Sequence, residues 1–343
     1  MPSIDLRSDT VTLPCDEMKE AMVRAELGDD VIDVDPTLDQ LEKTIAQVLG
    51  KEAAIFMPSG TMTNQIAIRI HCVQGDEILC EEGCHIYNYE QAGCAQLPGV
   101  VARPIPARDY LLKIEDLRDK IRPDNEHMAR TRLVCLENTH NRGGGRILPL
   151  EEVLQITDWA KENGLATHLD GARLFNAVVA TGVPADQWAS CFDTVSVCFS
   201  KGLGAPIGSA LAGTSEQVAA ARRHRKLMGG AMRQVGVVAS AALYALDNNV
   251  ARLQHDHEHA RIIADAVNQS SQLQLEPEQV DTNIVIFRVD RSGLDATTFV
   301  QKLEEKGVRT LPFSRHHVRV VTHLHISKAD AEFAAEQIVT CAG

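Results

Sequence analysis

Short, mostly apolar runs alternate with amphipathic stretches along the first two-thirds of the chain. Runs at 52–57, 77–80 and 133–137 are bounded by polar or turn residues and predict buried strands. Residues 37–49 instead repeat apolar positions at three- and four-residue spacing after Pro36, which predicts an amphipathic helix. This alternation predicts an α/β fold, with a mostly parallel sheet covered by helices. By the same criteria, further strands are expected at 100–104, 165–169 and 194–199, and further helices at 16–27 and 62–72.

A different pattern covers the last third of the chain. Residues 215–270 are rich in helical patterns, and the remainder alternates strand, helix, strand and helix. The expected elements are strands at 283–289 and 318–323 and helices at 296–306 and 329–340. A chain of 343 residues is long enough to form two domains. We therefore expect a large domain over 1–250 and a small C-terminal α+β domain over 251–343.

Composition narrows the class of protein. The net charge of −13 argues against a nucleic-acid surface or a polybasic membrane anchor. The first ten residues are polar, so no signal peptide is expected, and no run approaches the roughly 20 apolar residues of a membrane span. Nine scattered cysteines without a C-x-x-C pair indicate reduced thiols. We expect a cytoplasmic protein that binds a small molecule.

The chemistry centres on an acid and a lysine that each follow a predicted strand. Asp170 follows the run 165–169 in H-L-D-G-A-R, and Lys201 follows the run 194–199 in S-K-G-L-G. Both therefore fall at the carboxyl edge of a parallel sheet, where ligands bind. A lysine that forms a Schiff base and a carboxylate that keeps a pyridinium nitrogen protonated are the two groups that pyridoxal phosphate (PLP) requires. The pair predicts a PLP site.

Two further motifs fit such a site. Ser59, Gly60 and Thr61 stand between a predicted strand and helix, where backbone N–H groups can hold a phosphate, although Ser or Thr there is more often a simple helix cap. His85 follows another strand and could stack on the cofactor ring while accepting a proton, although a histidine is more often only a core or surface residue.

Two arginines could bind a substrate carboxylate. Arg173 lies three residues after Asp170, and Arg319 lies on a strand of the C-terminal part. A guanidinium can hold a carboxylate with two hydrogen bonds, although Arg319 could equally be a surface residue. His255 and His259 would share a helix face and could bind a metal, but a solvated polar face explains them better, so no metal site is expected.

Together these motifs resemble the threonine aldolases (the low-specificity L-threonine and L-allo-threonine aldolases), a family of the aspartate-aminotransferase-like, fold type I PLP enzymes. The resemblance extends along nearly the whole chain. The matching segments are I-D-L-R-S-D-T-V-T at 4–12, G-D-D-V at 28–31, D-P-T at 35–37, G-K-E-A-A-I-F at 50–56, P-S-G-T-M at 58–62, L-E-N-T-H-N at 136–141, H-L-D-G-A-R-L-F-N-A at 168–177, S-K-G-L-G-A-P-I-G-S at 200–209, G-G-A-M-R-Q at 229–234 and V-R-V-V-T-H-L at 318–324.

The resemblance implies a role for each matching residue. It implies that Lys201 holds PLP, that Asp170 pairs with the ring nitrogen, and that Ser59, Gly60 and Thr61 hold the phosphate while His85 stacks on the ring. Arg173 would reach the ring oxygen and, with Ser8 and Arg319, the substrate carboxylate, and residues 1–30 would help to form the site. Lys226 and Arg233 would lean into a neighbouring subunit's site in a dimer or tetramer. His85 and His127, the latter near the substrate side chain, are the candidate catalytic bases.

The resemblance implies a mostly parallel seven-stranded sheet and a PLP-dependent lyase that cleaves L-threonine, L-allo-threonine and related β-hydroxy-α-amino acids to glycine and an aldehyde. One alternative is another PLP reaction, such as β-elimination, transamination or phenylserine cleavage. A second alternative is a catalytically weak homologue that binds PLP. It is motivated by Ile32 and Asp33, which stand where the family usually has tyrosine and glycine.

Overall fold

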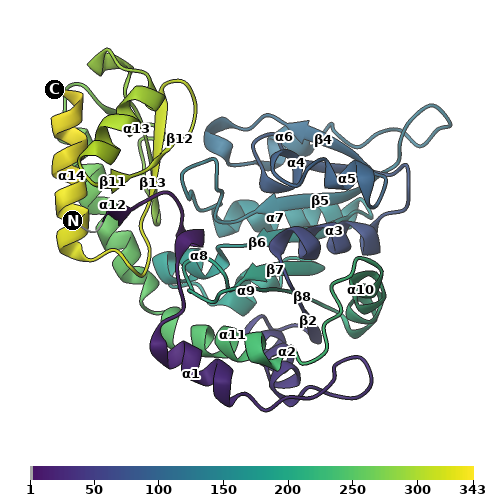
Figure 1. The fold of residues 1–343 in the computed structure, drawn as a ribbon. Helices are drawn as coiled ribbons and strands as arrows, with labels where there is room; N and C mark the ends of the chain where they lie inside the picture. The colour runs from purple at the N-terminus through teal and green to yellow at the C-terminus, as the bar shows by residue number, and fades with distance from the viewer. Residues whose placement is uncertain (1–2) are drawn as a thin grey trace.

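A seven-stranded sheet forms the centre of the molecule in this computed structural model, which describes residues 3–343 (Figure 1). The strand order is β2–β8–β7–β6–β5–β3–β4. Neighbours from β7 to β4 are parallel, whereas β8 is antiparallel to both β7 and β2. The strands are β2 (Ala53–Met57), β3 (Glu77–Glu81), β4 (Val101–Ile105), β5 (Thr131–Glu137), β6 (Ala166–Gly171), β7 (Thr194–Cys198) and β8 (Ser209–Gly213).

Helices cover both faces of this sheet, so its inner strands β3, β7 and β8 are buried on both sides. In β2, Phe56 packs into one hydrophobic cluster and Ile55 into another, as expected for side chains that alternate along a strand. One face carries α2 (Pro36–Val48), α7 (Leu150–Glu162), α8 (Leu174–Thr181), α9 (Ala185–Ala189) and α11 (Gly236–Asn249). The other carries α3 (Gly60–His71), α4 (His85–Asn88), α5 (Gly93–Gln96) and α10 (Ser215–Leu227).

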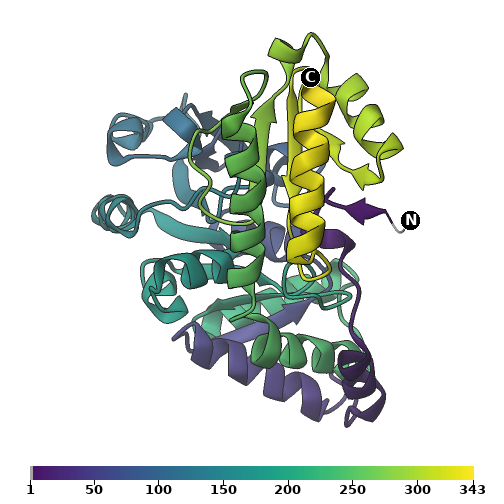
Figure 2. The ribbon, with the colours of Figure 1, turned by 90° about the vertical axis from the view of Figure 1, so that its left-hand side faces the viewer.

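The C-terminal part forms a smaller α+β unit with its own hydrophobic core. Its antiparallel sheet has the order β12 (Leu311–Pro312), β13 (His317–Val321), β10 (Ile284–Arg288) and β9 (Gln274–Leu275). Three helices cover it: α12 (Leu253–Gln269), α13 (Ala296–Glu305) and α14 (Lys328–Ala342). Figure 2 shows α12 and α14 side by side. The division of the chain at residue 250 stays a prediction.

The N-terminal segment connects the two parts (Figure 1). β1 (Ile4–Asp5) pairs in parallel with β11 (Val308–Arg309) of the C-terminal unit. The 3₁₀ turn η1 (Asp9–Val11) then enters the region between the two sheets, and α1 (Asp16–Arg24) packs on α11. The first residues of the chain are therefore positioned by its last quarter.

The predicted strands and helices of both parts are confirmed with shifts of a few residues at their ends. One difference concerns Asp170, which lies inside β6 instead of beyond it, and a second concerns β8, which the sequence pattern does not predict. The remaining short elements are η2 (Arg108–Tyr110), α6 (Ile114–Leu117) and η3 (Asp290–Ser292). Within residues 3–343, no helix is both long and apolar enough to span a bilayer.

Candidate active site

The carboxyl ends of β2, β5, β6 and β7 surround a cavity of about 320 Å³. β2 runs in the same direction as β7 because both are antiparallel to β8, so its end lies at the same edge of the sheet. The cavity is the place where most of the predicted site residues meet. It is lined by Ser59, Gly60, Thr61, His85, Asp170, Arg173 and Lys201, together with Asn64, Glu137, Thr139 and Asn141.

Asp170 is a buried carboxylate held by two donors. Its Oδ1 accepts a hydrogen bond from the backbone N–H of Ala172, and its Oδ2 accepts one from Asn64 Nδ2 at 2.8 Å. Burial alone would raise its pKa, but the positive charges of His85 and Lys201 and the Asn64 hydrogen bond hold the pKa of Asp170 below its usual range. A carboxylate with a lowered pKa at this point suits a pyridinium nitrogen that must stay protonated.

His85 begins α4 and is fixed by two carboxylates. Its backbone N–H donates to Glu137 Oε2 at 2.6 Å, and its Nδ1 lies 2.9 Å from Glu90 Oε1. Burial lowers the pKa of the imidazole, but the hydrogen bond to Glu90 and the nearby carboxylates outweigh that effect, so the pKa of His85 is raised. Because Nδ1 faces Glu90, Nε2 is the nitrogen available to a ligand.

The turn between β2 and α3 has the features of a phosphate site. Ser59 is the N-cap of α3, and its Oγ accepts a hydrogen bond from the Met62 N–H at 3.2 Å. At Gly60, an added Cβ would lie 2.9 Å from Cys198 Sγ, so the close approach of the turn to β7 requires glycine. The Thr139 hydroxyl at the same cavity is buried without a partner, which a ligand oxygen or nitrogen would supply. These residues fit PLP.

Arg173 is already engaged within the protein. Its Nε and Nη2 each donate to Asp9 at 2.7 Å, and both side chains are buried. Burial would raise the pKa of Asp9, but Arg173 outweighs it and lowers this pKa to about 2. If Arg173 bound a substrate carboxylate with two hydrogen bonds, it would have to give up its hydrogen bonds to Asp9. Nη1, whose nearest partner is Asn141 at 3.4 Å, is the remaining donor.

A second hollow of about 440 Å³ adjoins the cavity and shares His85, Arg173 and Lys201 with it. Ser8 and Arg319, the residues predicted to bind the substrate carboxylate, line this hollow. The Arg319 guanidinium donates to Asn141 Oδ1 at 3.1 Å and to the Arg7 carbonyl at 3.2 Å.

Three predicted residues lie outside both hollows. His127 is on the connection between α6 and β5, where its side chain is 80% exposed. Lys226 is exposed near the end of α10, and Arg233 is half-exposed and pairs with Asp29. The structure therefore does not bring these three residues to the cavity of their own chain.

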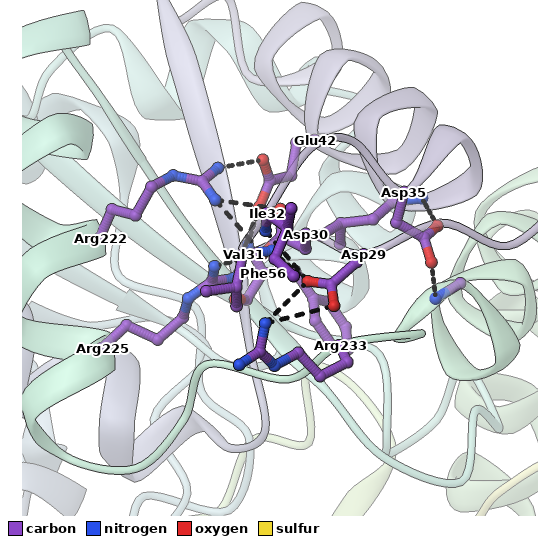
Figure 3. Close-up of polar contacts among 12 residues, drawn as sticks. Asp29, Asp30, Val31, Ile32, Asp35, Glu42, Phe56, Arg222, Arg225 and Arg233 are labelled. Atoms are coloured by element: carbon purple, nitrogen blue, oxygen red, sulfur yellow. Dashed lines mark hydrogen bonds and ion pairs between the residues drawn. The ribbon is translucent and has the colours of Figure 1, made fainter.

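The segment 28–35, where this chain departs from the family pattern, also lies outside the cavity. Ion pairs hold it against α10 and the loop that follows: Asp30 contacts Arg222 and Arg225 of α10, and Asp29 contacts Arg233 of the loop (Figure 3). Ile32 projects from this anchored segment and is 80% exposed.

The residues that sequence analysis missed form hydrogen bonds to the predicted ones. Asp9, Asn64, Glu90, Glu137 and Asn141 are polar, and the first four are buried. None belongs to a short sequence motif that predicts a catalytic or binding role. Asp9 and its partner Arg173 are separated by 164 residues in the sequence. Asp9, Glu137 and Asn141 lie in segments that match the family pattern, and Asn64 and Glu90 lie close to the Ser59 turn and to His85, but neither signal assigns them a role.

Comparisons with known proteins find similar sequences along nearly the whole chain. The model of the beta-eliminating lyase family matches residues 5–291. Low-specificity L-threonine aldolase 1 of Arabidopsis thaliana is 42% identical over 338 residues, which covers 97% of this chain and 94% of that protein. The low specificity L-threonine aldolase of Escherichia coli (strain K12) is 42% identical over 334 residues, which covers 97% of both.

Solved structures confirm the expected fold type I architecture. The threonine aldolase of Leishmania major superposes with a TM-score of 0.84 at 20% identity, covering 99% of this chain and 100% of that one. At that identity the similarity concerns the fold alone.

Proposed function

Because the chain belongs to the threonine aldolases, within the beta-eliminating lyase family, we propose that it cleaves L-threonine, L-allo-threonine and related β-hydroxy-α-amino acids to glycine and an aldehyde. The cofactor is PLP. The observation that carries the proposal is the convergence of Lys201, Asp170 and His85 on one cavity with the Ser59 turn. When bound, PLP withdraws electrons from the substrate α-carbon as the bond to the β-carbon breaks.

Each residue of the cavity has a distinct task in this reaction. Lys201 holds the cofactor, and Asp170 keeps its ring nitrogen protonated. Arg319 and Ser8, with the remaining Nη1 of Arg173, bind the substrate carboxylate and so decide which bond at the α-carbon is aligned for cleavage.

We assign the base to His85. Its Nε2 takes the proton of the β-hydroxyl as the carbon–carbon bond breaks and the aldehyde forms, while Nδ1 stays hydrogen-bonded to Glu90. Its place in both hollows supports this assignment over His127, which would have to approach from another copy of the chain.

The proposal includes a homo-oligomer, a dimer or tetramer, in which Lys226 and Arg233 reach a neighbouring phosphate site. Among residues 3–343, the only lysine and arginine lining the cavity are Lys201 and Arg173, and Arg173 is paired with Asp9. A phosphate at the Ser59 turn would therefore gain its counter-charge from another subunit. A cytoplasmic location is supported by nine free cysteines.

The first experiment is to measure aldehyde release from L-threonine by the purified protein, with and without added PLP. PLP-dependent acetaldehyde is expected. His85→Asn should lose most of this activity, and its retention would remove His85 as the base. Bound PLP without aldehyde would favour a different β-substituted amino acid, transamination or a catalytically weak homologue.

A further inference from the structure

A continuous series of hydrogen bonds between side chains, here called the His71–Asp170 network, links the amino ends of the parallel strands to Asp170. His71 Nε2 lies 2.9 Å from Thr194 Oγ1, and Thr194 Oγ1 lies 2.9 Å from His168 Nδ1. His168 Nε2 lies 3.1 Å from Asn64 Oδ1, and Asn64 Nδ2 then donates to Asp170 Oδ2. His71 lines a separate hollow of about 580 Å³ at the amino ends of the parallel strands.

The local geometry explains how these residues meet. Asn64 and His71 are two turns apart on α3 and so share one face of that helix. His168 and Asp170 are two residues apart on β6 and so point to the same face of the sheet. Thr194 on β7 is paired directly with His168 across the sheet. Thr194, His168 and Asn64 are essentially inaccessible to solvent.

The donor-to-acceptor direction of the hydrogen bonds in this network is set by the carboxylates of Asp170 and Glu90. The Asn64 amide nitrogen faces two carboxylates, because Nδ2 donates to both Asp170 Oδ2 and Glu90 Oε1 at 2.8 Å. Turning the amide around would place its oxygen against both carboxylates. Asn64 Oδ1 must therefore accept from His168, so the proton of His168 is on Nε2 and its Nδ1 accepts from the Thr194 hydroxyl.

This direction agrees with the state of His168. A neutral imidazole has one N–H, and reversing this direction would move that proton to Nδ1 and leave Asn64 without a donor. Burial lowers the pKa of His168 to about 3, so the ring is neutral at physiological pH. Every donor in the His71–Asp170 network then points toward the carboxylate of Asp170.

We propose that His168 is a positioning residue for the cofactor site, which acts with Thr194 to fix the Asn64 amide and, through it, the carboxylates of Asp170 and Glu90. Asp170 faces the cofactor nitrogen, and Glu90 orients His85, so one amide orients both halves of the site. The inference rests on the proposed PLP site, but not on which substrate is cleaved.

The test compares two substitutions at His168, which lies outside the cavity lining. His168→Met removes the donor to Asn64 in a similar volume, whereas His168→Gln keeps an N–H at that end. PLP affinity is measured by equilibrium dialysis of each purified protein, and the visible spectrum of the bound cofactor is recorded. His168→Met should bind PLP about tenfold more weakly and shift its absorption band, since a buried acceptor loses its donor. His168→Gln should stay within about threefold of the parent.

Thr194→Val and Thr194→Ser provide a second pair should His168→Met fail to fold. The valine variant removes only the hydroxyl and is expected to weaken PLP binding, whereas the serine variant keeps it. A purely structural role would lower the melting temperature without altering PLP affinity or the spectrum. Parent-like affinity and spectrum in a folded His168→Met, or in Thr194→Val, would overturn the proposal. A parent protein that binds PLP but releases no aldehyde would refute the proposed activity alone.

Discussion

His85 reaches the cavity with one ring nitrogen already committed to Glu90. Glu90 is in turn fixed, because its Oε1 also accepts from Asn64 and its Oε2 accepts from Gln65 Nε2 at 2.6 Å. A buried carboxylate with no freedom to rotate sets the orientation and the tautomer of the imidazole beside it. The reactivity of His85 thus depends on a residue that the substrate does not touch.

Replacing Glu90 with glutamine tests this dependence. Glu90 raises the pKa of His85 against the opposing effect of burial, so Glu90→Gln should lower that pKa. A base works in its unprotonated form, so the acid limb of the kcat/KM profile should move to lower pH. We expect kcat to fall roughly 10- to 100-fold because the ring loses its orientation.

The measurement is aldehyde release across pH, with the exposed Glu82→Gln as the matched control. An acid limb that stays in place in Glu90→Gln would contradict the assignment of Glu90.

The residues that sequence reasoning found are those whose chemistry is visible in a local motif. Asp170 lies near the end of β6 and Lys201 follows β7 by three residues, and the structure brings them to one cavity. Asp9 could not be found in this way, because its partner Arg173 is distant in sequence and only the folded chain brings them together. Asn64 and Glu90 were missed because an amide or acid near a helix start has many ordinary uses.

The start of α3 is the element on which the phosphate site depends. The turn passes so close to β7 that Cys198 Sγ occupies the space next to Gly60. The helix also carries Asn64 and His71, so its axial position sets both the phosphate turn and the support of Asp170. A shift of this one helix would disturb both.

Gly60→Ala should therefore weaken PLP binding although alanine favours the helix. The added methyl group would contact Cys198 Sγ, and the helix start or the thiol would have to move. We expect PLP affinity to fall about tenfold, as an overpacked site typically costs 1–3 kcal/mol. The double variant Gly60→Ala with Cys198→Ala should recover most of the affinity in the same dialysis measurement. No loss in the single variant, or no recovery in the double, would contradict this account.

Strand prediction succeeded where the side chains are large or β-branched and failed where they are small. The strands predicted before Asp170 and Lys201 contain leucine, valine and threonine between turn residues, a composition that favours a strand, and both are confirmed. β8 has the sequence Ser-Ala-Leu-Ala-Gly, whose small side chains carry little strand preference. Its burial between β2 and β7 comes from tertiary packing, which the local pattern does not encode.

On the scale of the whole molecule, an anchored apolar segment stands out from the surface. Val31, Ile32 and Val34 are exposed on a segment whose acids are held by arginines of α10 and by Arg233 (Figure 3). A rigid segment with exposed apolar side chains is typical of a contact surface. Arg233 pairs with Asp29 of this segment, and Lys226 directly follows Arg225, which pairs with Asp30, as the proposed oligomer requires of residues near a subunit contact.

Ile32→Asp should weaken assembly, because a charge would be buried in the subunit contact. We expect a smaller mass by size-exclusion chromatography with light scattering, together with weaker PLP binding. Val73→Asp is the control, since Val73 is also exposed but lies at the far end of α3. An unchanged mass for Ile32→Asp would separate this segment from the subunit interface.

The N-terminal segment has a consequence for how the protein is made. Ile4 pairs with Val308, the Arg7 carbonyl accepts from Arg319, and Thr12 Oγ1 donates to the Lys201 carbonyl. Ile4 and Arg7 leave the ribosome among the first residues, but Val308 and Arg319 are synthesised among the last forty, long after Lys201, the partner of Thr12. A nascent chain that lacks its end has no completed pocket, so catalysis begins only once translation is nearly finished.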